Sequence, residues 1–275
     1  MKKSAITLVQ VATLLFAIAC DAADMETVAV IGTGDMGDSI GPRFAGLGYR
    51  VVYGSRSPES DRVRALVRKT GANASAATQM EAARQADIVV IVVSWPVMET
   101  VAQSLGNLDG KIVIDVSMPF KQGEDGYPDH LLETSSAEMI QGWNPGAKVV
   151  KTFASMGSYI IDDPMAAGGL VSMPIASDDR DAKEKVAGIV AAMGLDPVDF
   201  GPLRMAREIE HLQLIYMIPL SQNRPQNWEF YFRRGDHYGC YMSHGTTTEG
   251  LVPVYDADNL AVFPQGRESP MPCPE

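Results

Sequence analysis

The feature that most limits the fold of this chain is a series of apolar runs that alternate with helical patterns. The runs lie at residues 26–31, 50–53, 86–93 and 110–117. Largely apolar runs of this length are typical of parallel strands that are covered on both faces. Because helical segments separate them, we predict an α/β fold with a doubly wound, Rossmann-type parallel sheet.

The later part of the chain continues the alternation. Strands are expected at 147–153, 170–177 and 195–202, and helices at 178–193 and 203–220, whereas 120–145 is a looser insertion with some helix. Helical starts are expected at Pro58 and Pro96. We therefore divide the chain into a leader (1–24), a dinucleotide-binding domain (25–146), a small α/β segment that completes the fold (147–222) and a C-terminal appendage (223–275).

The first residues resemble an export signal. Lys2 and Lys3 precede an uncharged apolar run at 5–19, which ends in small residues before Cys20. The run is short for a membrane span but suits a secretory leader. It predicts export to the periplasm, and "AIAC" also resembles a bacterial lipobox, so attachment to the envelope through a lipid on Cys20 stays open beside plain cleavage. A start at Met25 would instead give a cytoplasmic protein.

Composition excludes some classes. Apolar residues make up 46% of the 275 residues, which indicates a globular chain, and the net charge of −11 argues against a nucleic-acid partner. Beyond Cys20, Cys240 and Cys273 either pair in an oxidising compartment or are unrelated thiols. The spacing of cysteines and histidines suggests no metal site.

The glycine pattern G-x-G-x-x-G directly follows the first predicted strand and opens a helix. In that context Gly32 allows a tight turn, Gly34 lets the backbone approach a pyrophosphate, and Gly37 lets the helix pack against the strand. Free amides at the helix start then face the phosphates. The predicted pyrophosphate site comprises Gly32, Thr33, Gly34, Asp35, Met36 and Gly37. The alternative is a glycine turn without a ligand.

The end of the second strand indicates which nucleotide binds. NAD sites commonly place an acid there, but this chain has Ser55 and Arg56. Both side chains can donate hydrogen bonds to a 2′-phosphate, so the sequence favours NADP(H) over NAD(H). The alternative is that Arg56 is a solvated surface residue.

The next strand end should border the same crevice. We predict that Val93, Ser94 and Trp95 contact the cofactor, since ligands bind outside the carboxyl ends of such strands. For Trp95 the alternative is that it only covers the sheet edge. Residues 117–119 are expected to face the same crevice.

With these motifs in view, the chain resembles the NADPH-dependent reductases of the deazaflavin coenzyme F-420 over about residues 27–220. The resemblance is carried by "VAVIGTGDMG", "GSRSPE", "ADIVVIVVSWP", "LDGKIVIDVSMP", "AKVVKTF", "GLVSMPIASDD" and "MGLDPVDFGPLRMAREIEHL". It implies an NADP(H)-dependent oxidoreductase that transfers a hydride between nicotinamide and a deazaflavin, a flavin or a similar small redox carrier. It also implies a homodimer.

The chain departs from that family's pattern at positions expected to lie near the second substrate. Met118 and Ala154 stand where polar residues are common, and the basic residue expected near Ser60 is missing. No side chain stands out as a catalytic acid or base; His211 is either structural or close to the crevice. Two other functions stay open, a non-catalytic NADP-binding envelope protein and an imine or hydroxyacid reductase.

Overall fold

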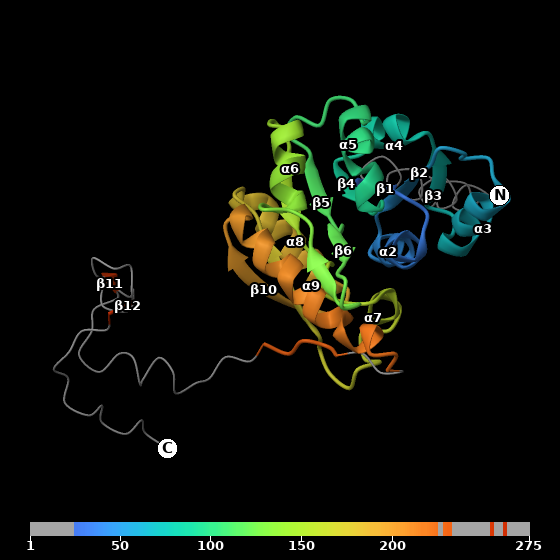
Figure 1. The fold of residues 1–275 in the computed structure, drawn as a ribbon. Coiled ribbons are helices and arrows are strands. Elements are labelled where there is room, and N and C mark those ends of the chain that lie inside the picture. Colours follow the sequence, from blue (N-terminus) through green and yellow to red (C-terminus); the bar gives the residue numbers. More distant parts are fainter. Residues whose placement is uncertain (1–24, 225–227, 233–253, 256–260, 263–275) are drawn as a thin grey trace, which may run out of the picture. The chain divides into compact units, whose positions relative to one another are not determined.

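The computed structural model describes residues 25–224, 228–232, 254–255 and 261–262. Its main feature is one eight-stranded sheet in the order β10-β9-β8-β5-β4-β1-β2-β3 (Figure 1). The strands are β1 (Thr27–Ile31), β2 (Arg50–Gly54), β3 (Ala74–Ala77), β4 (Ile88–Ile91), β5 (Ile112–Asp115), β8 (Lys148–Lys151), β9 (Ser172–Ala176) and β10 (Asp196–Gly201). The predicted doubly wound Rossmann-type sheet is thus confirmed.

Most neighbouring strands in this sheet are parallel. The exception is β9, which pairs antiparallel with β8 through Lys151 and Ala176, while β10 runs parallel to β9. The carboxyl ends of β1, β2, β4, β5 and β8 therefore meet at one edge. Because the strand order reverses between β1 and β4, the crevice expected for a ligand lies at that edge.

Helices cover both faces of the sheet. The helices are α2 (Asp35–Gly46), α3 (Asp61–Thr70), α4 (Gln79–Gln85), α5 (Met98–Ser104), α6 (Ser136–Trp143), α7 (Ser158–Asp162), α8 (Arg180–Ala192) and α9 (Ala206–Ser221), with 3-10 turns at Trp95–Val97 and Leu203–Met205. In Figure 1 α4 and α5 lie above the strands and α2 below them.

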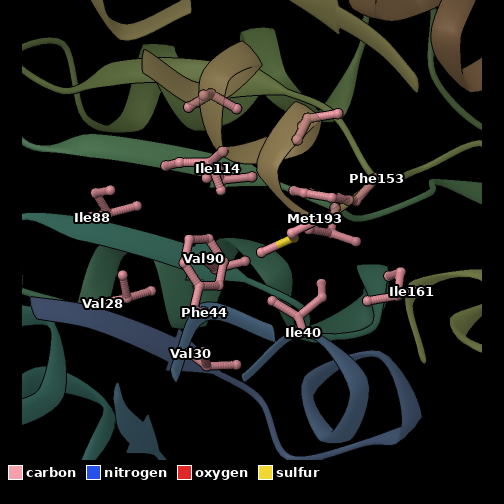
Figure 2. Packing of buried hydrophobic residues seen from close by; sticks show 14 of the residues in the cluster. Val28, Val30, Ile40, Phe44, Ile88, Val90, Ile114, Phe153, Ile161 and Met193 are labelled. Atoms are coloured by element: carbon pink, nitrogen blue, oxygen red, sulfur yellow. The ribbon is translucent and has the colours of Figure 1, made fainter. Parts of the chain in front are cut away.

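The two faces bury separate apolar cores, because alternate residues of each strand point to opposite faces. Val28, Ile88 and Ile114 pack with α2, α7 and α8 on one face, as Figure 2 shows for Phe44, Met193 and their neighbours. On the other face Ala29, Val89 and Val113 pack with α4, α5 and α6. Burial on both faces explains why these strands are apolar without alternation.

Several elements differ from the prediction. Strand β3, with sequence ASAA, was not expected, because its short side chains carry no apolar pattern. The helix expected from Pro58 begins only at Asp61, with Ser60 as its N-cap. The loose stretch at 120–145 forms a hairpin of β6 (Phe120–Gln122) and β7 (Pro128–His130), followed by α6.

The chain forms two compact units, one ending at Tyr231 and one beginning at Phe232. The first unit thus includes residues 228–231, which the prediction assigned to the appendage. In the second unit the structure describes the antiparallel pair β11 (Val254–Tyr255) and β12 (Ala261–Val262). The predicted leader at 1–24 and the cysteines Cys240 and Cys273 lie outside the described residues. Of the helices that are described, none is both long enough and apolar enough to span a bilayer.

Candidate functional site

The glycine turn after β1 shows three different reasons for a glycine. Gly32 has φ +123°, and a Cβ there would lie 2.7 Å from the carbonyl oxygen of Val92. A Cβ at Gly37 would lie 2.3 Å from the carbonyl oxygen of Gly32. At Gly34 a Cβ would meet no atom of the described residues within 4 Å. The fold itself therefore requires Gly32 and Gly37, whereas the missing side chain at Gly34 leaves space that a ligand can use.

Helix α2 begins directly at this turn. Gly34 is its N-cap and offers no side chain to cap the helix. The first amides of a helix have no partner within it, and they carry the positive end of the helix dipole. The turn thus presents main-chain N–H groups beside the open space at Gly34, which is the arrangement that binds a pyrophosphate.

A cleft of about 540 Å³ opens above the turn. It runs between the carboxyl ends of β1, β2 and β4 and the helices α4 and α5. Its lining comprises Gly32, Thr33, Gly34, Gly54, Ser55, Arg56, Arg62, Gln79, Val92, Val93, Ser94, Val97, Thr100, Val101 and Ser104. The residues predicted from three strand ends are therefore brought together in one cleft.

The ribose end of the cleft is basic. Ser55 Oγ accepts a hydrogen bond from the Ser57 amide at 3.1 Å, and the exposed Arg56 side chain lines the cleft beside it. Arg62, from the first turn of α3, also lines the cleft and lies 4.0 Å from the exposed Asp35 carboxylate. Arg62 corrects the prediction that no basic residue follows the Ser-Arg pair; the sequence signal was present two residues after Ser60.

The end of β2 is held firmly beneath these groups. Tyr53 is fully buried, and its hydroxyl lies 2.6 Å from Thr70 Oγ1. Burial raises the pKa of Tyr53 to about 12, so the phenol is neutral at physiological pH. Tyr53 therefore anchors the strand end that carries Ser55 and Arg56.

Other predicted residues take different positions. Val93 and Ser94 line the cleft, but Trp95 does not; its ring stacks on Trp143, with centroids 6.3 Å apart. Asp35 is exposed, Met36 packs against the core, and Gly37 is buried; none of the three is among the residues that line the cleft. Gln79, Thr100 and Ser104 were missed, because polar residues on a helix carry no signal of what they face.

Among the described residues that line the cleft, none is a histidine, cysteine, lysine, aspartate or glutamate. His211 of α9 is half exposed and lies tilted by 30° against the ring of His130, with centroids 4.9 Å apart, and it is not among the residues that line the cleft. Within the described part of the chain, no three His, Cys, Asp or Glu side chains are arranged to hold a metal ion.

The fold, the glycine turn and the basic cleft together define a dinucleotide-binding protein of the Rossmann type. Residues 27–119 match the family model for NADP oxidoreductase coenzyme F420-dependent. The chain is 29% identical over 219 residues to the F420-dependent NADP reductase of Methanothermobacter thermautotrophicus, which covers 74% of this chain and 92% of that protein.

Two further relatives extend the comparison. A solved structure of a candidate F420-dependent NADP reductase from Arthrobacter sp. FB24 is 29% identical, with a TM-score of 0.68 over 75% of this chain and 99% of that one. Metalloreductase STEAP3 of Rattus norvegicus is 29% identical over 187 residues, which cover 68% of this chain. The match spans only 36% of the length of that metalloreductase.

The resemblance noted in the sequence is thereby confirmed. Residues 27–119 match the model of the coenzyme F420-dependent NADP oxidoreductases, and the chain as a whole is similar to NADP-dependent reductases.

Proposed function

We propose that this protein is an NADP(H)-dependent oxidoreductase that transfers a hydride between nicotinamide and a deazaflavin such as coenzyme F-420, or a similar small electron carrier. The observation that carries the proposal is the cleft itself. It combines an uncapped helix start, an empty space at Gly34 and two arginines, Arg56 and Arg62. The end of β2, where NAD-binding sites commonly have an acid, carries Ser55 and Arg56 instead.

The chain's residues divide the binding work along the cleft. The amides of residues 34–37 face the pyrophosphate, and the open space at Gly34 allows the close approach that a side chain would block. Ser55 and Arg56 donate to the 2′-phosphate, and Arg62 adds a second guanidinium. Val93 and Ser94 line the part of the cleft where the nicotinamide would lie, and the C4 carbon of the nicotinamide supplies the hydride when NADPH is bound.

The second substrate meets a less polar surface. Ala154 is buried at the end of the β8 segment, and Met118 is half buried after β5. Met118 can offer the acceptor apolar contact but no side-chain amide, and Ala154, at 1% exposed, offers it no polar group either. A planar ring system such as a deazaflavin or flavin suits such a surface.

Calorimetry and turnover test the proposal together. NADPH is expected to bind at least tenfold more tightly than NADH, since a charge-assisted contact to the 2′-phosphate contributes about 1.5–3 kcal/mol. Under anaerobic conditions, NADPH oxidation is then followed with coenzyme F-420, with FMN and with ferric citrate as acceptors. NADPH binding without turnover on any carrier would overturn the proposal and leave a non-catalytic NADP-binding protein.

The choice of acceptors also separates the other candidates. The ferric arm is included because a metalloreductase is as similar to this chain as the F420-dependent reductase is, at 29% identity for both. Reduction of ferric citrate without F-420 or flavin would favour a metal-reducing role. Activity on an imine or a hydroxyacid, in place of a redox carrier, would favour the reductases of those substrates.

Location and assembly are proposals of the same kind. The leader-like residues 1–24 support export, with the mature protein in the periplasm or lipid-anchored at Cys20. N-terminal sequencing of the mature protein and its distribution between membrane and soluble fractions distinguish these from a start at Met25. Light scattering on the purified protein tests the homodimer that the family resemblance implies.

A further inference from the structure

A buried charged cluster lies at the carboxyl ends of β5 and β8, and its residues are not among those that line the nucleotide cleft. Lys151 and Asp115 are register partners across the two strands, and Nζ lies 2.9 Å from Oδ2. Glu210 of α9 lies 3.0 Å from the same Nζ. The side chains of Lys151, Asp115 and Glu210 are all 0% exposed. Because removing three charges from water is costly, stability alone is a weak reason for this arrangement.

A continuous hydrogen-bonded chain of side chains runs through the cluster. Ser117 Oγ donates to Asp115 Oδ1 at 2.6 Å. Ser136 Oγ lies within hydrogen-bond distance of Asp115 Oδ2 and 2.5 Å from Glu210 Oε1. Glu210 Oε2 lies 2.7 Å from His130 Nε2. Each side chain in this hydrogen-bonded series thus contacts the next one.

The hydroxyl of Ser136 lies between two carboxyl groups. It has one proton to donate, yet it lies at bonding distance from an oxygen of Asp115 and from an oxygen of Glu210. Both contacts can be hydrogen bonds only when one of the two carboxyl groups is protonated. That carboxyl group then donates to Ser136 Oγ, and the Ser136 hydroxyl donates to the other carboxylate. Passing that proton across Ser136 reverses both hydrogen bonds and leaves the geometry unchanged.

The charge of the cluster leaves room for one proton. Burial lowers the pKa of the Lys151 ammonium, but the nearby carboxylates Asp115 and Glu210 outweigh it and raise that pKa above its ordinary value. Lys151 is therefore a fixed positive charge, which also donates to Ser136 Oγ at 2.9 Å. Two carboxylates and one ammonium carry a net charge of −1, and one proton, held by a carboxyl group or by His130, which pairs with Glu210, makes the network neutral.

The outer end of the chain reaches the surface. The His130 side chain on β7 is 10% exposed, and its Nδ1 lies 2.6 Å from the Leu132 carbonyl. Its ring lies tilted against that of His211, which is half exposed and lies 3.8 Å from Glu208. The other charged groups nearby, Arg207 and Glu138, are occupied by their own ion pair. Protons from solvent can therefore enter at the two histidines.

The inner end of the chain lies beside the crevice. Asp115 is the register partner of Ile91 on β4, so Ser117, two residues further on, is level with Val93. Val93 lines the nucleotide cleft. Ser117 therefore ends the chain at the strand edge toward which the nicotinamide half of the cofactor points.

We propose that these side chains form a proton relay from the surface to the reaction crevice, running through His130, Glu210, Ser136, Asp115 and Ser117. The inference rests on the proposed function, because reduction of a deazaflavin or flavin needs one hydride and one proton. The C4–H bond of NADPH breaks and a C–H or N–H bond forms on the acceptor, so NADPH is oxidised and the acceptor is reduced. The relay supplies the proton that a ring nitrogen of the acceptor takes up, and solvent replaces it at His130.

The test compares two hydroxyls that are neighbours in sequence. Ser136→Ala breaks the relay, whereas Ser135→Ala removes a buried hydroxyl that only caps α6 and serves as the control. Both variants are expected to lose some stability and to bind NADPH as the wild type does. In single turnovers with coenzyme F-420, Ser136→Ala is expected to react about 100-fold more slowly, with a changed pH profile and solvent isotope effect. Ser136→Thr, which keeps the hydroxyl, is expected to recover most of the rate.

A measurement on the ligand-free protein tests the shared proton without any turnover. In the infrared spectrum of the ligand-free protein, the carbonyl stretch of a neutral carboxyl group is expected, because Ser136 Oγ contacts both carboxyl groups. Glu210→Gln should remove that band, whereas Glu138→Gln should keep it. An unchanged band in Glu210→Gln, or wild-type pH dependence in Ser136→Ala, would overturn the relay. A wild-type protein that reduces no acceptor would instead overturn the proposed function.

Discussion

A Cβ on Gly37 would lie 2.3 Å from the carbonyl oxygen of Gly32, whereas a Cβ on Gly34 would contact nothing in the part of the chain that the structure describes. Two glycines of one turn thus serve different purposes. One permits the close packing of α2 on β1, and the other leaves room above the helix start for a ligand.

This difference predicts opposite phenotypes for two alanine substitutions. Gly37→Ala is expected to destabilise the protein by about 1–3 kcal/mol, because the backbone atoms it meets cannot move aside cheaply. Gly34→Ala should leave the unfolding free energy nearly unchanged and weaken NADPH binding. Urea unfolding and calorimetry on both variants measure the two effects. If Gly34→Ala bound NADPH normally, the pyrophosphate would lie elsewhere.

The two arginines at the cleft should set the nucleotide preference. Arg56→Ala and Arg62→Ala are each expected to weaken NADPH binding by about 10–100-fold and NADH binding far less, because each removes a charge-assisted contact to the 2′-phosphate. Arg68→Ala is the matched control, since Arg68 is an exposed arginine on α3, the helix that carries Arg62, and is not among the residues that line the cleft. Equal losses for both nucleotides would show that these arginines do not select NADP(H).

Trp95 should matter for stability more than for binding. Its ring stacks on Trp143 and does not line the cleft. Trp95→Leu is therefore expected to lower the unfolding free energy by about 1–2 kcal/mol and to change the NADPH dissociation constant by less than about threefold. Calorimetry decides the point: a large loss of affinity would restore Trp95 to the cofactor site as first predicted from the sequence.

The buried ammonium of Lys151 should be far more important than its surface neighbour. Lys151→Met leaves Asp115 and Glu210 buried without a counter-charge and is expected to cost about 3–5 kcal/mol. Lys148→Met, on the same strand, removes only a partly exposed pair with Asp179 and should cost less than about 1 kcal/mol. Urea unfolding at neutral pH compares them, and similar losses would contradict the buried network.

Acid should weaken the link between α6 and α9. Burial raises the pKa of Glu138, but hydrogen bonds from Arg207, Ser135 and Thr134 outweigh it and lower that pKa to about 2. Because the folded-state pKa lies below the ordinary value, the stabilisation is complete above about pH 5 and is lost as the pH falls toward 2. Glu138→Gln keeps the cap of α6, and is expected to be less stable than wild type by about 0.5–1 kcal/mol at pH 6. Unfolding curves should converge near pH 2; a gap that does not shrink would show that the charge is not responsible.

The sequence was sufficient for the parts of the fold that follow from local patterns. The buried strands β1, β4 and β5 were evident because burial on both faces leaves no polar positions, and the turn at Gly32 was evident because its glycines are required by sterics. Strand β3 was missed since ASAA owes its place to pairing with β2 rather than to its own propensity.

The site was predictable to the same extent. Ser55, Arg56, Val93 and Ser94 follow strand ends, so topology alone brings them together in one cleft. Gln79, Thr100 and Arg62 come from helices whose rotation is set by tertiary packing, and only the structure shows which of their side chains face the cleft. The contact between His130 and Glu210 joins a hairpin to a helix far along the chain, and no local pattern indicates it.

The antiparallel attachment of β9 to β8 has a consequence for how such a protein can change. Lys151 and Ala176, which pair across the two strands, are the last residues of β8 and β9, so the chain leaves β9 beside the carboxyl end of β8. The connection that follows β10 leads into α9 and brings Glu210 to Lys151. A change in the length of that connection over evolutionary time would therefore displace Glu210 from Lys151, which limits how freely this half of the sheet can vary.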